Sequence, residues 1–126
     1  MEKKYDLEER LISFAVRIMD LIETLPNTRA GNHVAGQLVR CGTSPAPNYG
    51  EAQSAESRSD FIHKIRIVLK ELRETNVWLQ IICRRRMTRS ADRTKSLIPE
   101  CNELISIFVA SEKTAKRNKR SKAMEA

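Results

Sequence analysis

The sequence predicts an all-α fold, an antiparallel up-down four-helix bundle whose second helix is kinked. The chain has 126 residues, the size of one domain, and contains only four Gly and four Pro. Several segments carry apolar residues at alternating spacings of three and four, the period of one helix face. No stretch alternates apolar and polar residues between turn signals, as a half-buried strand would.

The first helix is expected from about Leu7 to Thr24. Asp6 precedes it as a cap residue, and Glu9 follows three residues later, which is the spacing of a capping box. Pro26 ends the helix, because the residue before a proline is disfavoured in the α conformation. The apolar stripe of this helix consists of Leu7, Leu11, Phe14, Ile18, Leu21 and Leu25.

The second helix is expected from about Arg29 to Cys41, with Asn27 or Thr28 as its cap. Its glycines, Gly31 and Gly36, either permit the close approach of another helix or merely weaken this one.

A short helical segment from Pro45 to about Ser54 is expected to continue the second helix after a kink. Ser44 followed by Pro45 as the first helical residue is typical of a helix start. Pro47 would lie in the first turn, where it loses no intrahelical hydrogen bond but disfavours α geometry at Ala46.

The third helix is expected from Ser57 to Arg86, a stretch without Gly or Pro. Ser57 or Ser59 caps it, and a helix of this length would extend about 45 Å. Its stripe has one polar gap, at Thr75. The apolar members of the stripe are Phe61, Ile65, Val68, Leu72, Leu79 and Ile82.

The fourth helix is expected to start near Ser90 or Asp92 and to reach about Glu112. Pro99 lies inside this stretch, so either the regular helix starts near Ser96 or it is kinked at the proline. The stripe consists of Leu97, Cys101, Leu104, Phe108, Ser111 and Ala115.

The net charge of +7 is concentrated in two segments, which leaves a mildly acidic remainder. Concentrated positive charge attracts polyanions and favours nucleic acid through counterion release; solubility is the alternative role. The composition divides the chain into a bundle over residues 1–112 and a basic, disordered tail over residues 113–126. The proposed nucleic-acid contacts are Arg84, Arg85, Arg86, Arg89, Arg93 and Lys95 in the first segment and Lys116, Arg117, Lys119 and Arg120 in the second.

The cysteine pattern predicts reduced thiols in a cytoplasmic protein. Cys41, Cys83 and Cys101 are odd in number, widely spaced and placed on or beside apolar stripes. The charged N-terminal segment is unlike a signal peptide, and no run approaches the roughly 18 apolar residues of a membrane span.

No motif predicts catalysis, a cofactor or a bound metal. Asp60 and His63 lie one turn apart, but a di-iron bundle needs two such Glu-x-x-His pairs and two further Glu residues. Nothing near His33 completes the ligand set. We therefore expect a protein that is not an enzyme and that has no small-molecule substrate.

Charged and aromatic residues in the middle of the chain favour a structural interpretation. The charged set, Glu51, Lys64, Lys70, Glu71 and Glu74, can form ion pairs between neighbouring helices or one turn apart. Tyr49 and Trp78 more often fill a core or an interface than stack on a nucleobase.

The sequence also resembles a known family through several short motifs. These are Arg29-Ala30-Gly31, Gly42-Thr43-Ser44, Asn48-Tyr49-Gly50-Glu51-Ala52, Ala55-Glu56-Ser57-Arg58-Ser59-Asp60-Phe61-Ile62-His63-Lys64, Val68-Leu69-Lys70-Glu71-Leu72-Arg73-Glu74-Thr75 and Trp78-Leu79. Together they resemble the bacterial four-helix-bundle family named for proteins encoded in 23S rRNA intervening sequences. The resemblance covers roughly Leu7 to Phe108 and implies a cyclic homo-oligomer, with a pentamer as the expected form. The chain departs from the family pattern at Pro45 and Pro47.

Three hypotheses for function follow. The first is a non-enzymatic oligomeric bundle that binds RNA or another nucleic acid through its basic segments, mainly by phosphate contacts. The second is a protein-interaction scaffold without nucleic-acid binding, in which residual apolar residues form the subunit contacts. An enzyme built on the bundle is the third and weakest interpretation.

Overall fold

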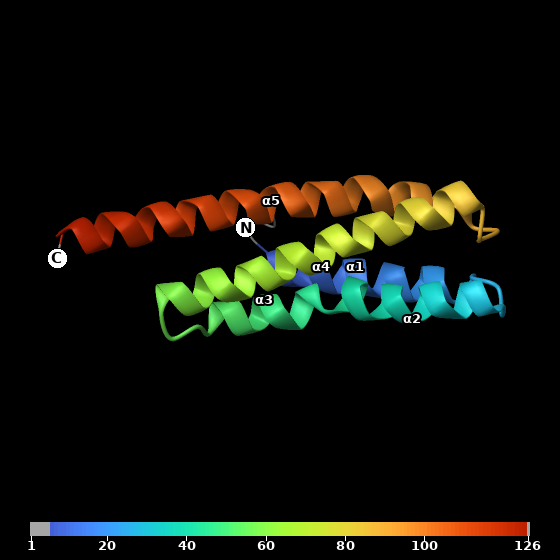
Figure 1. Cartoon of the computed structure of the whole chain (residues 1–126), viewed down its shortest axis with the longest axis horizontal. Coiled ribbons are helices and arrows are strands. Elements are labelled where there is room, and N and C mark those ends of the chain that lie inside the picture. Colours follow the sequence, from blue (N-terminus) through green and yellow to red (C-terminus); the bar gives the residue numbers. More distant parts are fainter. Residues whose placement is uncertain (1–5, 126) are drawn as a thin grey trace.

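The computed structural model describes residues 6–125 and forms the predicted all-α bundle (Figure 1). Helix α1, the joined α2 and α3, α4 and α5 run in alternating directions, and no strand occurs among the described residues. Residues 1–5 of the predicted bundle and residue 126 of the predicted tail lie outside the described part. The helices are α1 (Leu7–Ile22), α2 (Arg29–Thr43), α3 (Pro45–Gln53), α4 (Arg58–Arg85) and α5 (Ala91–Glu125).

Helices α2 and α3 together form the predicted kinked second helix. Ser44 joins them with helical dihedrals (φ −63°, ψ −35°), so the chain bends without leaving the α region. The prediction that Ser44 caps α3 is wrong, because its side chain makes no capping bond. The Ser44 hydroxyl instead accepts a hydrogen bond of 2.8 Å from the Asn48 amide, which also reaches the Ser44 carbonyl at 3.0 Å.

Three side chains cap helix N-termini, each with a hydrogen bond of 3.0 Å from a backbone N–H three residues on. Asp6 caps α1, as predicted. For α2 and α4 the sequence left two candidates each, and the structure selects Thr28 and Ser57. Each cap satisfies one of the N–H groups that a first turn leaves unpaired.

The core contains the predicted stripes of α1, α4 and α5. Leu11, Phe14, Ile18 and Leu21 of α1 are at most 1% exposed, and the stripes of α4 and α5 meet them. Thr75, the predicted polar gap, is also buried, and its hydroxyl donates to the Glu71 carbonyl at 2.8 Å. A buried hydroxyl is tolerated there because its hydrogen bond is made within the helix.

The cysteines Cys41, Cys83 and Cys101 are free, and Cys41 and Cys101 are buried. Burial raises the pKa of the Cys101 thiol to about 12, and its Sγ lies 3.2 Å from the Leu72 carbonyl oxygen. Both buried thiols therefore act as small core residues.

Helix α5 is longer than predicted at its C-terminal end. It starts at Ala91, as expected, and passes through Pro99, so the alternative of a start near Ser96 is wrong. The predicted end near Glu112 is also wrong, because the helix continues to Glu125. Ala115 is buried, and Lys, Arg, Ala and Glu are strong helix formers, so packing and propensity both extend the helix. The division into a bundle and a separate tail stays a prediction.

Among the helices of residues 6–125, none is both long and apolar enough to cross a membrane.

The C-terminus of α4 is closed by an arginine in the left-handed conformation. Arg86 has φ 54° and ψ 52°. The Met87 N–H bonds the Ile82 carbonyl at 3.1 Å and the Arg86 N–H bonds the Cys83 carbonyl at 3.3 Å, which together form a Schellman motif. A side chain in this conformation costs roughly 1–2 kcal/mol, which glycine avoids.

Replacing Arg86 with glycine should therefore raise the free energy of unfolding by about 1 kcal/mol. Urea titration followed by circular dichroism measures this change. Arg85→Gly is the matched control, because it removes the same charge from the last helical residue, where glycine costs up to about 1 kcal/mol. If both variants lose stability equally, the left-handed turn is not strained by its arginine.

Candidate nucleic-acid interface

The two predicted basic segments lie at opposite ends of the bundle. The first surrounds the α4–α5 turn, and the second lies on the last turns of α5 beside the start of α4 (Figure 1). Arg93 and Lys116 are separated by 23 helical residues, or roughly 35 Å at 1.5 Å per residue. Within one chain they form two separate surfaces.

The surface at the α4–α5 turn, here called the turn surface, carries all six predicted cations in exposed positions: Arg84, Arg85, Arg86, Arg89, Arg93 and Lys95. The Arg84 guanidinium donates to Gln80 at 3.2 Å, and Arg93 lies 3.9 Å from the Asp20 carboxylate. Arg17 of α1 joins this surface by donating to Ser96 at 3.0 Å. Arg17 was not predicted, because the sequence does not show that α1 passes beside the start of α5.

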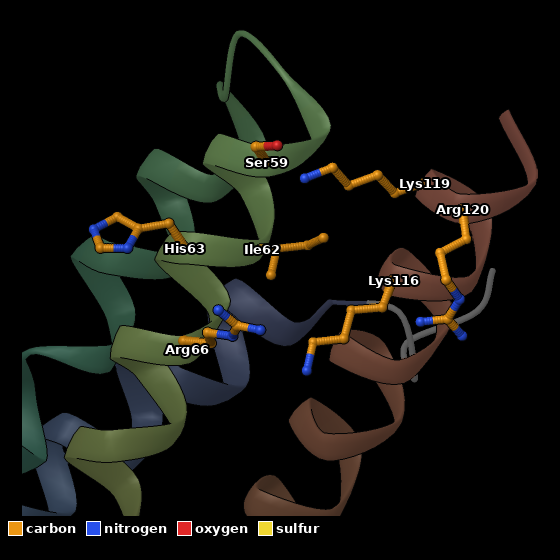
Figure 2. A pocket seen from close by; sticks show the side chains of 7 residues that line it. All are labelled: Ser59, Ile62, His63, Arg66, Lys116, Lys119 and Arg120. Atoms are coloured by element: carbon orange, nitrogen blue, oxygen red, sulfur yellow. The ribbon is translucent and has the colours of Figure 1, made fainter. Parts of the chain in front are cut away.

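The second basic surface is concave. A cleft of about 450 Å³ separates the first turns of α4 from the last turns of α5, and Figure 2 shows the residues that line it. We call it the α4–α5 cleft. Ser59, Ile62, His63 and Arg66 line it from α4, and Lys116, Lys119 and Arg120 line it from α5.

The side chains of the cleft bring positive charge from both walls into one space. In Figure 2 the Lys119 amine extends across the gap toward Ser59, and Arg66 faces the gap from the other wall. The His63 ring points away from α5 in this view. Phosphate oxygens could therefore contact cations from two helices at once, as in a groove that follows a nucleic-acid backbone.

One half-buried carboxylate, that of Glu112, holds two of the cleft cations in place. It accepts a hydrogen bond of 2.7 Å from Arg66 Nε and lies 3.2 Å from the Lys116 amine. The Arg66 hydrogen bond is the main reason that the pKa of Glu112 is lowered, with a further contribution from Lys116. Lys119 and Arg120 form no ion pair with any described residue. Four cations thus face a single carboxylate, and two of them remain available to an anion.

The sequence predicted the cations of only one wall of this cleft, the wall formed by α5. Lys116, Lys119 and Arg120 were predicted, whereas Arg66 was not, and Arg117 is exposed on α5 without lining the cleft. Arg66 is found only when α5 is known to continue past Glu112 alongside α4.

The comparisons with known proteins identify the family. The model of the family described as 23S rRNA-intervening sequence protein matches residues 3–110. The chain belongs to this family. A protein of unknown function from the S23 ribosomal protein family of Bacteroides thetaiotaomicron has a similar crystal structure, with 34% sequence identity and a TM-score of 0.76. That match covers 85% of this chain and 98% of the other. Among curated proteins, none matches the chain.

The residues that the 23S rRNA-intervening sequence family model matches include only one wall of the α4–α5 cleft. The wall from α4 falls inside residues 3–110, whereas Lys116, Lys119 and Arg120 follow them. The second wall of the cleft is built by the continuation of α5 beyond the matched residues.

The acidic and aromatic part of the family signature clamps α2 to α4. Arg40 of α2 donates to Glu71 at 2.9 Å and also pairs with Glu74. The Arg40 hydrogen bond is the main reason that the pKa of Glu74 is lowered. Trp78 donates to Glu74 at 3.2 Å, and its ring lies edge-on to His33 at 5.8 Å. Glu71, Glu74 and Trp78 therefore have a structural role.

The signature residues of α3 attach that segment to α4 and α5. Glu51 and Lys64 form the ion pair suggested by the sequence, at 2.6 Å. Tyr49 is buried with its ring edge-on to Phe108 at 5.5 Å, so it fills the core, as its structural interpretation predicted. Asn48 donates hydrogen bonds to Ser44 at the bend between α2 and α3.

Two signature residues make weaker contributions. Lys70 is exposed and forms no ion pair with Glu74, whose carboxylate is taken by Arg40. Phe61 is half-buried and packs against the core.

Among the described residues, no three His, Cys, Asp or Glu side chains gather as a metal site would require. Asp60 and His63 lie on the first turns of α4 without further ligands. The exposed cations of the two basic surfaces can attract anions electrostatically.

Proposed function

We propose that this chain is a non-enzymatic, oligomeric bundle that binds RNA through phosphate contacts. The observation that carries the proposal is the α4–α5 cleft, where four cations from two helices line one concave space of about 450 Å³. If the cations served only solubility, they would not need to lie together around one concave space. The family description, which concerns 23S rRNA intervening sequences, adds support.

The distribution of charge suggests how RNA would bind. Positive charge at both ends of a long bundle allows one strand to contact each end, and self-association would multiply the contacts. Phosphate contacts dominate affinity and carry little sequence information. We therefore expect strong salt dependence with weak sequence preference.

Removing the cleft cations should weaken RNA binding more than removing the same charge elsewhere on α5. The test variant replaces Lys116, Lys119 and Arg120 with glutamine. Each lost phosphate contact reduces the slope of log K against log salt by about 0.7–0.9, so we expect a reduction of roughly 2–3. Filter binding with a structured RNA across a salt series measures this slope.

The matched control replaces Lys113, Arg117 and Lys122 with glutamine. These residues are exposed on the same helical segment, carry the same total charge and do not line the cleft. We expect less than half the change in slope. Equal changes in slope for the two variants would show that total charge, and not position in the cleft, determines the salt dependence. A wild-type protein whose RNA affinity does not depend on salt would exclude the proposed function.

Self-association is proposed on a different observation. Ile12, Val16 and Met19 form an apolar stripe on the outer face of α1 and are 42%, 51% and 48% exposed. Their spacing of four and three places them on one helix face, where a second copy can cover them. The family resemblance suggests a cyclic assembly, with a pentamer as the expected form.

Charging this stripe should separate the subunits. Val16→Lys places an ammonium group in the centre of the stripe, and sedimentation velocity should show smaller assemblies or monomers. Val77→Lys on α4, where the valine is 56% exposed, is the control. Dissociation by Val77→Lys but not by Val16→Lys would move the proposed contact to α4.

The second candidate function, a protein-interaction scaffold, is favoured by the same stripe. In that case a partner protein covers α1 and the cations serve solubility. Co-purification of a partner that resists nuclease and also resists the cleft substitutions would favour the scaffold over RNA binding.

A further inference from the structure

A second hollow continues the α4–α5 cleft along the seam between the two helices. It has a volume of about 310 Å³ and is lined by Arg66, Leu69, Lys70 and Arg73 of α4 and by Glu112 of α5. Because Arg66 lines both the cleft and this hollow, the two spaces are neighbours. We call the cleft and the hollow together the α4–α5 groove.

The groove extends along half of α4. From Ser59 in the cleft to Arg73 in the hollow there are 14 residues, or roughly 21 Å at 1.5 Å per residue. Helices α4 and α5 diverge toward the start of α4 (Figure 1), and the cleft at that end is the larger of the two spaces. The groove is therefore an elongated surface that narrows toward the middle of α4.

The charge along the groove is almost entirely positive. Glu112 is the only carboxylate among the described residues that line it, and it is already paired with Arg66 and Lys116. Six cations against this one carboxylate give a balance of +5. Four of the six are exposed and form no ion pair with any described residue: Lys70, Arg73, Lys119 and Arg120. These four are available to a series of phosphates along the groove.

The shape of the groove favours one nucleic-acid strand over a duplex. Lys119 extends from α5 toward Ser59 of α4, and Arg66 faces the same gap from α4 (Figure 2). Only a backbone that enters between the helices can contact both walls at once. A duplex is thicker than an α-helix with its side chains, so it can only lie across the two rims. A single strand has one flexible backbone, which can follow the groove past Arg66.

The groove offers contacts to phosphates rather than to bases. Its lining within the described part of the chain contains no Phe, Tyr or Trp, and the His63 ring points away from α5 (Figure 2). Grooves that hold the bases of a single strand do so by stacking them on aromatic side chains. This groove can therefore bind a strand without regard to its sequence.

We propose that the α4–α5 groove binds a single, unpaired RNA strand lengthwise, with phosphates at Lys116, Lys119 and Arg120 in the cleft and at Lys70 and Arg73 in the hollow. The inference rests on the proposed function and deepens it in two ways. It identifies unpaired RNA as the ligand. It also adds Lys70 and Arg73, which lie outside both basic segments of the sequence.

The direct test compares a single strand with a duplex. The probe is a fluorescent oligouridylate of about 12 nucleotides, a length within the range of known single-strand sites. The comparison is a fully paired RNA with the same number of phosphates. Fluorescence anisotropy with the full chain should show about tenfold weaker binding of the duplex at the same salt concentration.

Substitution of the two cations in the hollow tests the path of the strand. Lys70→Gln combined with Arg73→Gln should reduce the slope of log K against log salt by about 1.4, or about 0.7 for each lost contact with a single strand. The matched control is Lys113→Gln combined with Arg117→Gln, which removes one Lys and one Arg from exposed positions of α5 outside the groove. Its slope should change by less than half as much.

Both double variants should keep the melting temperature of the wild type in circular dichroism, because all four substituted residues are exposed. Equal changes in slope for the two variants would overturn the proposed path of the strand, since total charge would then explain the effect.

Three outcomes separate this inference from the proposed function. Equal affinities for the single strand and the duplex, with a salt slope that the cleft substitutions reduce, would overturn the inference and leave the proposed function standing. Binding of oligodeoxythymidylate but not of oligouridylate would support a single-strand groove and overturn RNA as its ligand. Oligoglutamate of the same charge that binds as tightly as oligouridylate would overturn the inference, because the groove would then accept any flexible polyanion, acidic peptides included.

Discussion

Replacing Gly31 with alanine is expected to destabilise the bundle by about 3 kcal/mol or more. Gly31 is buried in the first turn of α2, and a Cβ there would overlap the backbone carbonyl oxygen of Pro26. A backbone atom cannot rotate aside as a side chain can, so the turn between α1 and α2 would have to move. The sequence left open whether Gly31 permits the close approach of another helix or merely weakens α2; the structure shows that it permits the close approach of the turn at Pro26.

Gly36→Ala in the same helix is the matched control. A Cβ at Gly36 meets nothing within 4 Å, and the residue is exposed. Alanine there should stabilise the protein by about 0.5–1 kcal/mol, since glycine is a poor helix former. Urea unfolding of both variants gives the comparison. If Gly31→Ala is as stable as Gly36→Ala, the approach of Pro26 to α2 is looser than the structure shows.

Truncating Phe108 to alanine is expected to cost about 3–5 kcal/mol, because it removes a fully buried ring and leaves a cavity. The ring packs edge-on against Tyr49, so the loss also loosens the contact between α3 and α5. A domain of this size has a stability of about 5–15 kcal/mol, so the variant could approach the unfolding threshold. Thermal and urea unfolding measure the loss.

Ser106→Ala serves as the control for Phe108→Ala. Ser106 is exposed two residues away on α5, and its replacement should change stability by less than about 0.5 kcal/mol. Phe108→Leu keeps much of the volume and should fall between the two variants. A cost below about 1 kcal/mol for Phe108→Ala would mean that the core around Tyr49 repacks easily.

Much of the fold could be predicted from the sequence because its signals are local and repeated. The spacing of Leu11, Phe14, Ile18 and Leu21 predicted the buried face of α1, and all four are buried. Cap residues beside these stripes set the helix starts to within one or two positions. The motifs from Asn48 to Trp78 indicated the family, which the match over residues 3–110 confirms.

The candidate site was only partly predictable. The predicted cations occur on exposed surfaces, but the sequence did not show which of them share a surface. Arg66 and Arg17 were missed for the same reason, since each joins a basic surface through a helix distant in sequence. The unpaired Thr94 hydroxyl was missed, although Thr94 lies three residues before Leu97 of the α5 stripe, because only the tertiary structure decides whether a buried hydroxyl has a partner.

By itself, the sequence determined the helical periodicity, the helix starts and the concentration of positive charge in two segments. Only the tertiary structure decided that α5 continues to Glu125 and that Lys116, Lys119 and Arg120 lie across a cleft from the first turns of α4. The reason is physical. A 3.6-residue period and a cap depend on neighbours within one or two turns, whereas a cleft depends on the length and direction of two helices whose residues are far apart along the chain.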